Sequence, residues 1–311
     1  MENIERYKHL NKYLKDKFGE RVLKICIDGG FTCPNRDGKL GYGGCIFCSE
    51  KGSGEHINSD TNITKQVENY FKSYKAKRAN KFIAYFQNFT NTYDTLDNLK
   101  KKYDAALIDD RIVGLSIATR PDCINEDIAK LLSSYKDKYY VTVELGLQTS
   151  NDETGKLIHR AYSSNEFTKA VELLNKYNID VVAHIMVGLP NETKKDLKST
   201  VEFINKHKIQ GLKIHSCYVV KNTALCDMYE EGEYSPLTLE EYLESATYIL
   251  THINPDIVIH RISGDAPKNL LVALDWNSHK KWIMNGLDKL LREKDLWQGM
   301  EYTDTQKKSS L

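Results

Sequence analysis

Short runs of apolar residues alternate along the chain with longer segments in which apolar residues recur every three or four positions. The apolar runs, which we predict to be strands, cover residues 21–27, 81–87, 111–119, 140–148, 179–190, 211–220 and 256–262. The segments with helical spacing cover residues 63–77, 94–107, 125–135, 164–177, 194–206 and 239–251. Strands that alternate with helices of this length are typical of βαβ units, in which helices cover a parallel sheet.

The number of these units distinguishes a complete barrel from a partial one. Six strand–helix units are clear, whereas a complete barrel of this kind has eight. We therefore predict an α/β fold whose main domain, residues 21–250, is an open, partial (β/α)6 TIM-like barrel. The late strand near Val258 is expected either to close the barrel or to help bind substrate.

Shorter elements are expected on both sides of this domain. Residues 1–20 are predicted to form an N-terminal amphipathic helix. Its apolar face holds Ile4, Tyr7, Leu14 and Phe18. Residues 251–311 are predicted to be a small C-terminal extension, with an amphipathic helix over residues 279–297 and a solvated tail.

Composition and charge narrow the class of protein. The 311 residues are 41% hydrophobic and 28% charged, with a net charge of +1, which gives no strong nucleic-acid or membrane signature. No apolar run is long enough to span a bilayer, and the lysine-rich start does not resemble a secretory signal. We therefore expect a cytoplasmic protein without a membrane partner. In that reducing compartment, clustered cysteines indicate metal binding or catalysis rather than disulfides.

Three of the seven cysteines lie in one glycine-rich loop. Cys33, Cys45 and Cys48 have the spacing C-x11-C-x2-C, and eight of the 18 glycines lie between Gly29 and Gly54. Such a loop buries little apolar surface, and glycine lets the backbone pass close to a bound group. Two thiolates separated by two residues can reach one metal ion or cluster.

Two inorganic groups fit this loop. A structural zinc ion takes four ligands, and His56 is available as the fourth. Three thiolates alone fit a [4Fe–4S] cluster that leaves one iron open to a small chelating ligand. Three unrelated reduced thiols are the remaining alternative. The cysteines outside the loop are predicted to be packed, structural thiols, namely Cys26, Cys123, Cys217 and Cys226.

The stretch "CPNRDGKLGYGGCIFC" after the first predicted strand resembles the cluster loop of the radical S-adenosylmethionine (SAM) superfamily. The common spacing there is C-x3-C-x2-C. The longer first gap resembles one branch, the Elongator catalytic subunit and its short bacterial relatives of the YhcC/YtqA type. Further motifs match that branch in order, namely "YFQNFTNTY", "ATRPDC", "VELGLQTSNDET", "HIMVGLPNET" and "IHSCYVVKNTAL". The resemblance covers roughly residues 20–275 and implies a barrel of the radical SAM type.

The resemblance implies an enzyme with two cofactors, a [4Fe–4S] cluster and SAM. Cys33, Cys45 and Cys48 would be the metal ligands and the catalytic residues, and the open iron would bind SAM. One electron from the reduced cluster would then cleave SAM to methionine and a 5′-deoxyadenosyl radical. The residues expected on the same grounds to bind the cofactor are Gln87, Thr90, Glu144, Gln148, Arg160 and His184.

Three motifs depart from the family's patterns. "FQNFTN" replaces the glycine-rich "GGE" type of motif, so Gln87 and Thr90 must contact SAM in its place. "ATRPD" replaces "ETRPD", so Ala118 supplies no carboxylate. His184 stands where some relatives have aspartate.

Polar residues after the third predicted strand and on the sixth are expected to bind substrate, because parallel barrels hold their sites at strand ends. They are Arg120, Asp122, Lys213 and His215. Lys213 and His215 are two residues apart and would share one strand face. The late strand contributes His260, Arg261 and Asp265 as further candidates.

Two basic stretches are candidates for contact with RNA. The first contains Lys72, Lys75, Lys77, Arg78 and Lys81. Tyr70, Phe71 and Tyr74 are interleaved with it, and the second stretch is residues 100–102. Such patches can follow phosphates while aromatic rings stack on bases. A solvated helix face with ordinary core aromatics is the alternative.

The leading hypothesis follows from the resemblance, because members of this branch modify wobble uridine in tRNA. It is a radical SAM enzyme that changes the C5 side chain of that uridine, for example from carboxymethylaminomethyl to aminomethyl. It implies tRNA, an electron donor such as flavodoxin or ferredoxin, and a downstream methyltransferase as partners. The alternatives are a radical SAM enzyme acting on a small metabolite or protein, and a non-enzymatic zinc-dependent RNA-binding protein.

Overall fold

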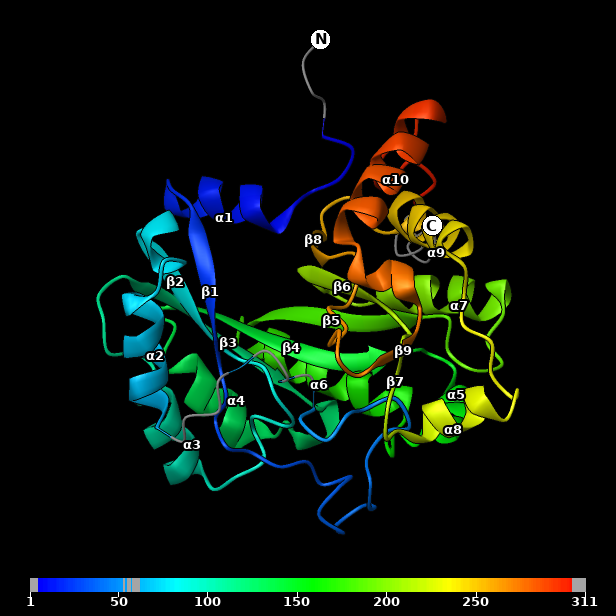
Figure 1. Ribbon diagram of the computed structural model, residues 1–311. Coiled ribbons are helices and arrows are strands. Elements are labelled where there is room, and N and C mark those ends of the chain that lie inside the picture. The colour runs from blue at the N-terminus through cyan, green and yellow to red at the C-terminus, as the bar shows by residue number, and fades with distance from the viewer. Residues whose placement is uncertain (1–4, 53, 55–56, 58–61, 304–311) are drawn as a thin grey trace, which may run out of the picture.

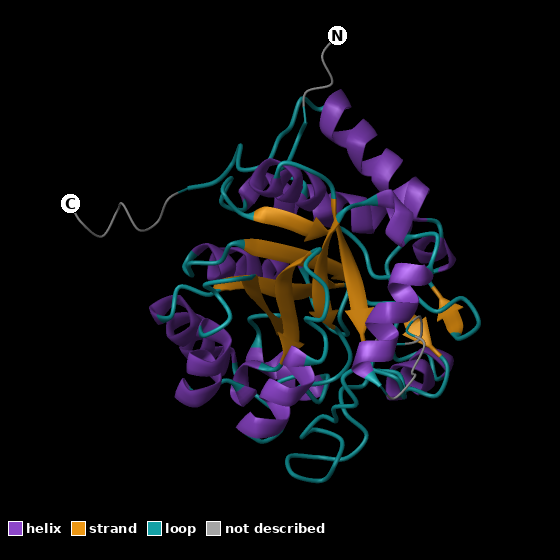
Figure 2. Cartoon of the chain, turned by 90° about the vertical axis from the view of Figure 1, so that its left-hand side faces the viewer, coloured by secondary structure: helices purple, strands orange, loops and turns teal. Residues whose placement is uncertain are grey.

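The computed structural model describes residues 5–52, 54, 57 and 62–303, and a curled parallel sheet forms its centre (Figures 1 and 2). In spatial order the strands are β1 (Val22–Ile27), β2 (Lys81–Phe86), β3 (Ile112–Thr119), β4 (Tyr140–Gln148), β5 (Asp180–Val187), β6 (Gly211–Ser216) and β8 (Val258–Arg261). Every neighbouring pair is parallel. The predicted partial barrel is therefore confirmed, and the late strand joins it as a seventh strand at one edge.

Helices connect the strands and cover the outer face of the sheet (Figure 2). They are α2 (Ile63–Lys72), α3 (Leu96–Asp104), α4 (Glu126–Ser133), α5 (Asp152–Leu157), α6 (Ser164–Lys176), α7 (Lys194–Asn205) and α9 (Leu239–His252). Side-chain caps explain where several of them begin. Thr193 and Thr238 each form a capping box with an acidic residue three positions later.

The two faces of the sheet differ in polarity. On β4, the buried side chains of Val143 and Leu145 belong to the main apolar core under the helices. Glu144 and Gly146 alternate with them and line a cavity on the concave side. Successive side chains of a strand point to opposite faces, so the same strands supply both the core and the site.

The N-terminal helix is shorter than the sequence predicted. Helix α1 (Leu10–Phe18) begins after Tyr7, so Tyr7 does not share its face, and Ile4 lies outside the described residues. His9 instead pairs with Ile259 of β8 in a parallel bridge, which ends the helix on its N-terminal side. Helix α1 contacts both β1 and β8, the two edge strands of the sheet.

The C-terminal part also differs in detail. The predicted strand over residues 211–220 is divided, because the chain turns after β6 and a second short strand leaves the barrel. This strand, β7 (Val219–Val220), pairs with β9 (Leu271–Ala273) in an antiparallel ribbon next to α8 (Ala224–Glu230). Helix α10 (Lys280–Glu293) packs on α9 and ends before the predicted boundary, where Asp295 adopts a positive φ of 46°.

Among the described helices, none combines the length and the apolar character that crossing a bilayer requires. The last residues of the predicted solvated tail, 304–311, lie outside the described residues.

Candidate active site

A cavity of about 960 Å³ lies on the concave side of the sheet. It extends from the loop that carries the three cysteines, at the carboxyl ends of the strands, to side chains in the middle of the strands. Of the residues predicted to form the site, those that line this cavity are Cys33, Cys45, Cys48, Gln87, Thr90, Arg120, Glu144, Gln148, His184, Lys213 and His215. Arg160 and Asp122 do not line it.

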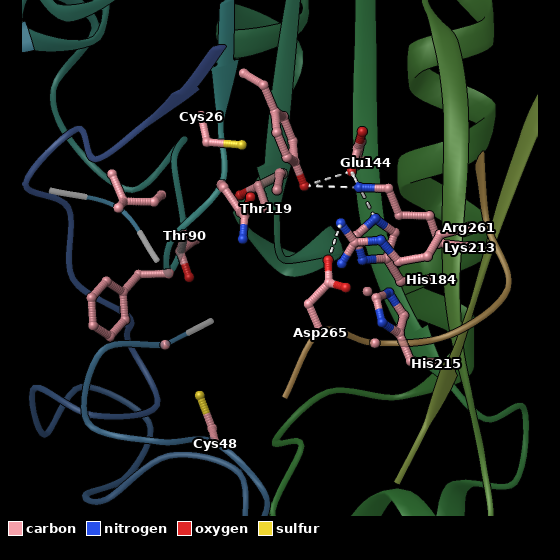
Figure 3. A pocket seen from close by; sticks show the side chains of 18 of the residues that line it. Cys26, Cys48, Thr90, Thr119, Glu144, His184, Lys213, His215, Arg261 and Asp265 are labelled. Atoms are coloured by element: carbon pink, nitrogen blue, oxygen red, sulfur yellow. Dashed lines mark hydrogen bonds and ion pairs between the residues drawn. The ribbon is translucent and has the colours of Figure 1, made fainter. Parts of the chain in front are cut away.

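Glu144 forms the centre of a polar floor in this cavity (Figure 3). Lys24 Nζ donates to its Oε1 at 2.7 Å, and the Tyr85 hydroxyl donates to its Oε2 at 2.8 Å. His184 Nε2 lies 2.8 Å from the same Oε2, and Lys213 forms an ion pair with it. The five residues come from β1, β2, β4, β5 and β6, so only the parallel register of the sheet brings them together.

The charges of this floor are strongly coupled. Burial alone would raise the pKa of Glu144, but Lys213, Lys24 and the hydrogen bond with His184 hold it well below its usual range. Burial lowers the pKa of Lys213, and the attraction of Glu144, with which it forms an ion pair, acts against this shift. Burial and the Lys213 charge lower the pKa of His184 to about 4, so its imidazole is neutral at pH 7.

This environment changes the expected role of Glu144. Its side chain is 0% exposed, and its carboxylate is already engaged by cations and hydroxyl groups. It therefore orients the groups around it instead of presenting a free acceptor to a cofactor. Because a buried carboxylate needs partners inside the protein, these contacts give Glu144 a positioning role, while its contact with the cofactor stays a prediction.

His215 lies beside this floor and shares the cavity face of β6 with Lys213, as predicted. Its ring centroid is 5.2 Å from that of His184. Burial, with His184 beside it, holds the pKa of His215 well below its usual range, so the ring is neutral. Within the described part of the chain, its buried Nε2 has no hydrogen-bond partner. A ligand in the cavity could supply one, which favours the predicted substrate contact.

The loop of residues 31–52, here called the cysteine loop, is held by its own backbone. The Cys33 carbonyl accepts a hydrogen bond from the Arg36 amide at 2.8 Å, and the Cys48 amide donates to the Cys45 carbonyl at 2.9 Å. The Arg36 guanidinium donates to the Cys48 carbonyl at 2.7 Å. Gly44 has a φ of 85°, and a Cβ there would lie 2.8 Å from Arg36 Nε. The residue before Cys45 must therefore be glycine for this turn to form.

Asn35 fixes the middle cysteine and was not predicted. Its side-chain amide donates to the His159 carbonyl at 2.6 Å and lies 3.8 Å from Cys45 Sγ. Burial, with Cys48 and Cys33 nearby, raises the pKa of the Cys45 thiol to about 12. Such a thiol becomes a thiolate at neutral pH when a metal cation replaces its proton, so this donor set suits iron or zinc.

The three thiols of the cysteine loop suit a bound cluster. Cys33, Cys45 and Cys48 line one cavity on a loop whose turns are built by glycine, as a bound cluster requires. Among the described residues, no three cysteine, histidine or acidic side chains are arranged so that they could hold a single metal ion. His56, the fourth ligand of the zinc alternative, lies outside the described residues.

Gln148 and Thr90 face the same cavity as the thiols. Gln148 ends β4 with a φ of 59°, a strained conformation for a non-glycine residue and one that often marks a functional position. The Tyr162 hydroxyl donates to Gln148 Oε1 at 2.8 Å. Thr90 is 0% exposed, and its hydroxyl has no partner in the part of the chain that the structure describes. Gln87, the residue after β2, also lines the cavity.

Arg160 requires a correction. Its fully buried guanidinium donates to the carbonyls of Leu147, Thr149 and Tyr162 at 2.6–2.9 Å and pairs with Asp152 at 2.7 Å. These contacts use most of its donors away from the cavity. Arg160 therefore holds the turn after β4 and is neither the cofactor ligand that was predicted nor a surface cation.

Arg120 and Asp122 bind each other in a bidentate ion pair, with distances of 2.9 and 2.7 Å. Arg120 also donates to the Arg160 carbonyl at 3.0 Å and lies over the Tyr162 ring. Arg120 lines the cavity, whereas Asp122 lies behind it. The predicted substrate contact therefore remains open to Arg120 alone, and Asp122 orients the guanidinium.

Cys26 was predicted to be a packed thiol, and this prediction is wrong. It is exposed to the cavity together with Lys24, whereas Ile25 and Ile27 enter the core. The polar–apolar alternation of "KICI" was the signal that could have identified both residues. Cys217 and Cys226 are buried as predicted, and Cys123 is half-buried.

Further residues line the cavity that the motifs did not identify as a group, and they include Tyr85, Tyr162, Tyr218 and Gly264. Arg261 and Asp265, which were candidates on the late strand and after it, also line it and pair at 3.3 Å. His260 faces Gly211 instead, where a Cβ would lie 2.6 Å from its Nε2. The late strand thus both closes one edge and contributes to the site.

A partial barrel with three cysteines at its cavity defines a known class of enzyme. Residues 33–204 match the model of the radical SAM superfamily, and residues 209–293 match that of the Radical_SAM C-terminal domain. The chain belongs to the radical SAM superfamily and is an enzyme of that class.

Particular relatives place it within the superfamily. It is 37% identical to YtqA of Bacillus subtilis (strain 168), over 99% of this chain and 96% of that protein. It is 34% identical to YhcC of Escherichia coli (strain K12), over 90% of each. A tRNA uridine(34) acetyltransferase of Methanocaldococcus infernus is 32% identical over 52% of this chain and 30% of that protein. The predicted Elongator-like branch is therefore confirmed.

A solved structure supports the same fold. The archaeal Elp3 of Methanocaldococcus infernus, with an N-terminal deletion, matches with a TM-score of 0.66 and 21% identity. The match covers 89% of this chain and 64% of that chain. At this identity the likeness concerns the arrangement of strands and helices.

Proposed function

We propose that this radical SAM enzyme modifies the C5 side chain of wobble uridine in tRNA, in a step of the carboxymethylaminomethyl-to-aminomethyl type. The observation that carries the proposal is one cavity in which the cysteine loop faces a cationic floor. The names of the more distant relatives, which act on tRNA uridine 34, support the choice of RNA as substrate.

Cys33, Cys45 and Cys48 would hold the [4Fe–4S] cluster on the loop side of this cavity. When bound and reduced, the cluster supplies the electron that cleaves SAM to methionine and a 5′-deoxyadenosyl radical. Thr90 and Gln148 would donate hydrogen bonds to SAM, and this is supported by their lining the same cavity as the thiols.

The opposite side suits an anionic group on the substrate. Lys24, Lys213 and Arg261 carry positive charge there, against the carboxylates of Glu144 and Asp265. A side chain that ends in a carboxylate would gain from this excess of cations. His215 would donate or accept one more hydrogen bond through its Nε2, which has no partner in the described ranges.

The burial of this floor has a second consequence. Ionic contacts are stronger where water is excluded, so a substrate group held there is oriented firmly toward the cofactor side. Water exclusion also protects a reactive radical from side reactions.

The proposal also includes partners and a place in the cell. A one-electron donor such as flavodoxin or ferredoxin would reduce the cluster, and a methyltransferase would use an aminomethyl product. All of these would meet the enzyme in the cytoplasm, where tRNA is modified.

The test combines chemistry in vitro with RNA analysis. Protein reconstituted anaerobically with iron and sulfide is supplied with SAM, a reductant and tRNA from a strain lacking the gene. We expect 5′-deoxyadenosine and a change in one wobble nucleoside, detected by mass spectrometry. The triple alanine variant at positions 33, 45 and 48 gives the background.

Two outcomes would separate the alternatives. SAM cleavage with an unchanged nucleoside profile would contradict the tRNA proposal and favour a small metabolite or protein substrate. One zinc and no iron in anaerobically purified protein would contradict the cluster. Membership of the radical SAM superfamily favours the enzyme over the non-enzymatic zinc protein.

A further inference from the structure

The first basic stretch lies beside the open edge of the half-barrel. Helix α2 contacts β1, which is an edge strand because the sheet does not close (Figure 1). Tyr70, Tyr74 and Lys75, at and after the end of α2, line the same cavity as the three cysteines. This segment therefore borders the cavity.

The cations of this segment are exposed and lack carboxylate partners within the described part of the chain. They are Lys72, Lys75, Lys77 and Arg78. Lys81, the fifth cation of the first basic stretch, differs from these four because it pairs with Glu20 at 3.6 Å. Tyr74 lies between these cations and is 78% exposed. An exposed ring among uncompensated cations is the combination that single-stranded RNA requires.

The second basic stretch lacks these properties. Lys100 pairs with Asp104 at 2.6 Å, and Lys102 pairs with Asp94 at 3.2 Å. Lys102 also lies over the ring of Phe31 at 3.8 Å. The charges of Lys100 and Lys102 are therefore compensated by carboxylates of the protein, whereas Lys101 has no ion pair among the described residues.

The structure also separates the aromatic residues of the first stretch. The rings of Tyr70 and Phe71 pack edge-on against Phe82, with centroids 5.9 and 5.0 Å apart, and Arg111 covers Phe71. Both belong to the packing around the core. Of the three interleaved aromatic residues, Tyr74 is exposed, whereas Tyr70 and Phe71 are partly buried.

We propose that Lys72, Lys75, Lys77 and Arg78, together with Tyr74, form a docking surface for the RNA strand that flanks the target nucleotide. The cations contact phosphates, and the Tyr74 ring stacks on a base next to the one that enters the cavity. This inference rests on the proposed function, because it assumes an RNA substrate. RNA explains the exposed ring at the cavity edge better than an acidic electron-transfer protein, which needs no stacking group.

The test measures the affinity of the full-length, cluster-reconstituted protein for an anticodon stem-loop by fluorescence anisotropy at several salt concentrations. Each phosphate contact to a single strand contributes about 0.7 to the slope of log K against log salt. Replacing Lys75, Lys77 and Arg78 together by glutamine should therefore reduce this slope by about two.

Tyr74 is tested by two further variants. Tyr74→Ala should weaken binding roughly tenfold to a hundredfold, while Tyr74→Phe, which keeps the ring, should bind as the wild type does. Matched controls are Lys100→Gln with Lys102→Gln, whose charges are already paired, and Trp282→Ala, an exposed ring on α10. These controls should leave the affinity and the salt slope unchanged, and circular dichroism verifies that each variant is folded.

The outcomes distinguish this inference from the proposed function. If the wild type binds RNA and the surface variants bind equally well, the docking surface is wrong while the substrate stands. If the wild type cleaves SAM but binds no RNA, the proposed function itself is wrong. If the variants bind RNA normally but slow SAM cleavage with flavodoxin and not with dithionite, the surface belongs to the electron donor.

Discussion

On the strand side of the cavity, Glu144 is enclosed by two lysines, a tyrosine hydroxyl and a neutral imidazole from four other strands, and its carboxylate is fully buried. On the loop side, Cys33, Cys45 and Cys48 are half-buried, and the Thr90 hydroxyl is without a partner among the described residues. Figure 3 shows Cys48 and Thr90 across the cavity from Lys213 and His184.

The two sides differ in whether their polar side chains are bound by other residues of the protein or are left for a cofactor. The strand side is satisfied by the protein's own contacts, so it is formed before any ligand arrives. The loop side has three thiols that suit a cluster and a Thr90 hydroxyl without a partner among the described residues, so a bound cofactor would complete it. Substitutions on the loop side should therefore reduce activity more than stability. Substitutions on the strand side should reduce stability more.

The largest effect is expected on the loop side. Replacing Cys33, Cys45 and Cys48 together by alanine should reduce SAM cleavage to background, because no thiolate remains to hold iron. The stability of the metal-free protein should hardly change, since the three thiols contribute little to the core. Measurements of 5′-deoxyadenosine and of thermal unfolding test both statements. Cys123→Ala, outside the cavity, should remain active, and an active triple variant would contradict the ligand assignment.

On the strand side, Glu144→Gln should destabilise the protein by about 3–5 kcal/mol, because Lys24 and Lys213 lose their buried counter-charge. Urea unfolding of the metal-free protein measures this effect. Glu153→Gln is the matched control, since its partner Lys156 is exposed on α5 and the pair is screened by water. Equal stability of the two variants would show that the floor does not depend on its central carboxylate.

The same carboxylate predicts a pH dependence. In the folded protein the pKa of Glu144 is lowered, so the unfolded chain takes up this proton first as the pH falls. Its stabilising contribution is therefore complete above its ordinary value of about 4.5 and is lost as the pH falls toward the folded pKa. The difference in unfolding free energy between the wild type and Glu144→Gln should shrink below pH 4.5. A constant difference from pH 7 to pH 3 would contradict the lowered pKa.

The smallest effect distinguishes two neighbouring threonines. Thr90→Val should leave stability unchanged or raise it, because it removes a buried hydroxyl without a partner in the described chain. The Kd for SAM should rise about tenfold, the value of one hydrogen bond. Thr92→Val should instead lower stability, because its hydroxyl bonds Thr119 at 2.6 Å and the Cys123 carbonyl at 2.8 Å. If both variants changed stability and the Kd for SAM in the same way, the distinction between the Thr90 hydroxyl and the bonded Thr92 hydroxyl would be wrong.

Much of the fold could be predicted because the relevant signals are local. The alternation of strands and helices follows from periodicity, and the spacing of the cysteines identifies the loop. Arg160 shows the limit of such local signals. Its position after the fourth strand matched a motif and predicted a cofactor contact. Its contacts with the carbonyls of Leu147 and Thr149 depend on how the following turn folds back.

Cys26 and Tyr74 are two further residues whose exposure the local sequence pattern did not predict. One strand residue, Cys26, faces the cavity instead of the core, and one of the three interleaved aromatic residues, Tyr74, remains exposed to solvent. In both cases the neighbours that decide the matter lie on other elements. Burial is a property of the assembled sheet and helices, so a local pattern leaves it undecided.

The sequence by itself determined the order of strands and helices, the three-thiol loop and the superfamily to which the chain belongs, because each depends on residues close together in the chain. The tertiary structure decided which polar side chains meet. Lys24, Glu144 and Lys213 are separated by long stretches of sequence, yet adjacent parallel strands bring them into one floor. It also decided which cations stay uncompensated, since a lysine's charge is neutralised only by the carboxylates that the fold places beside it.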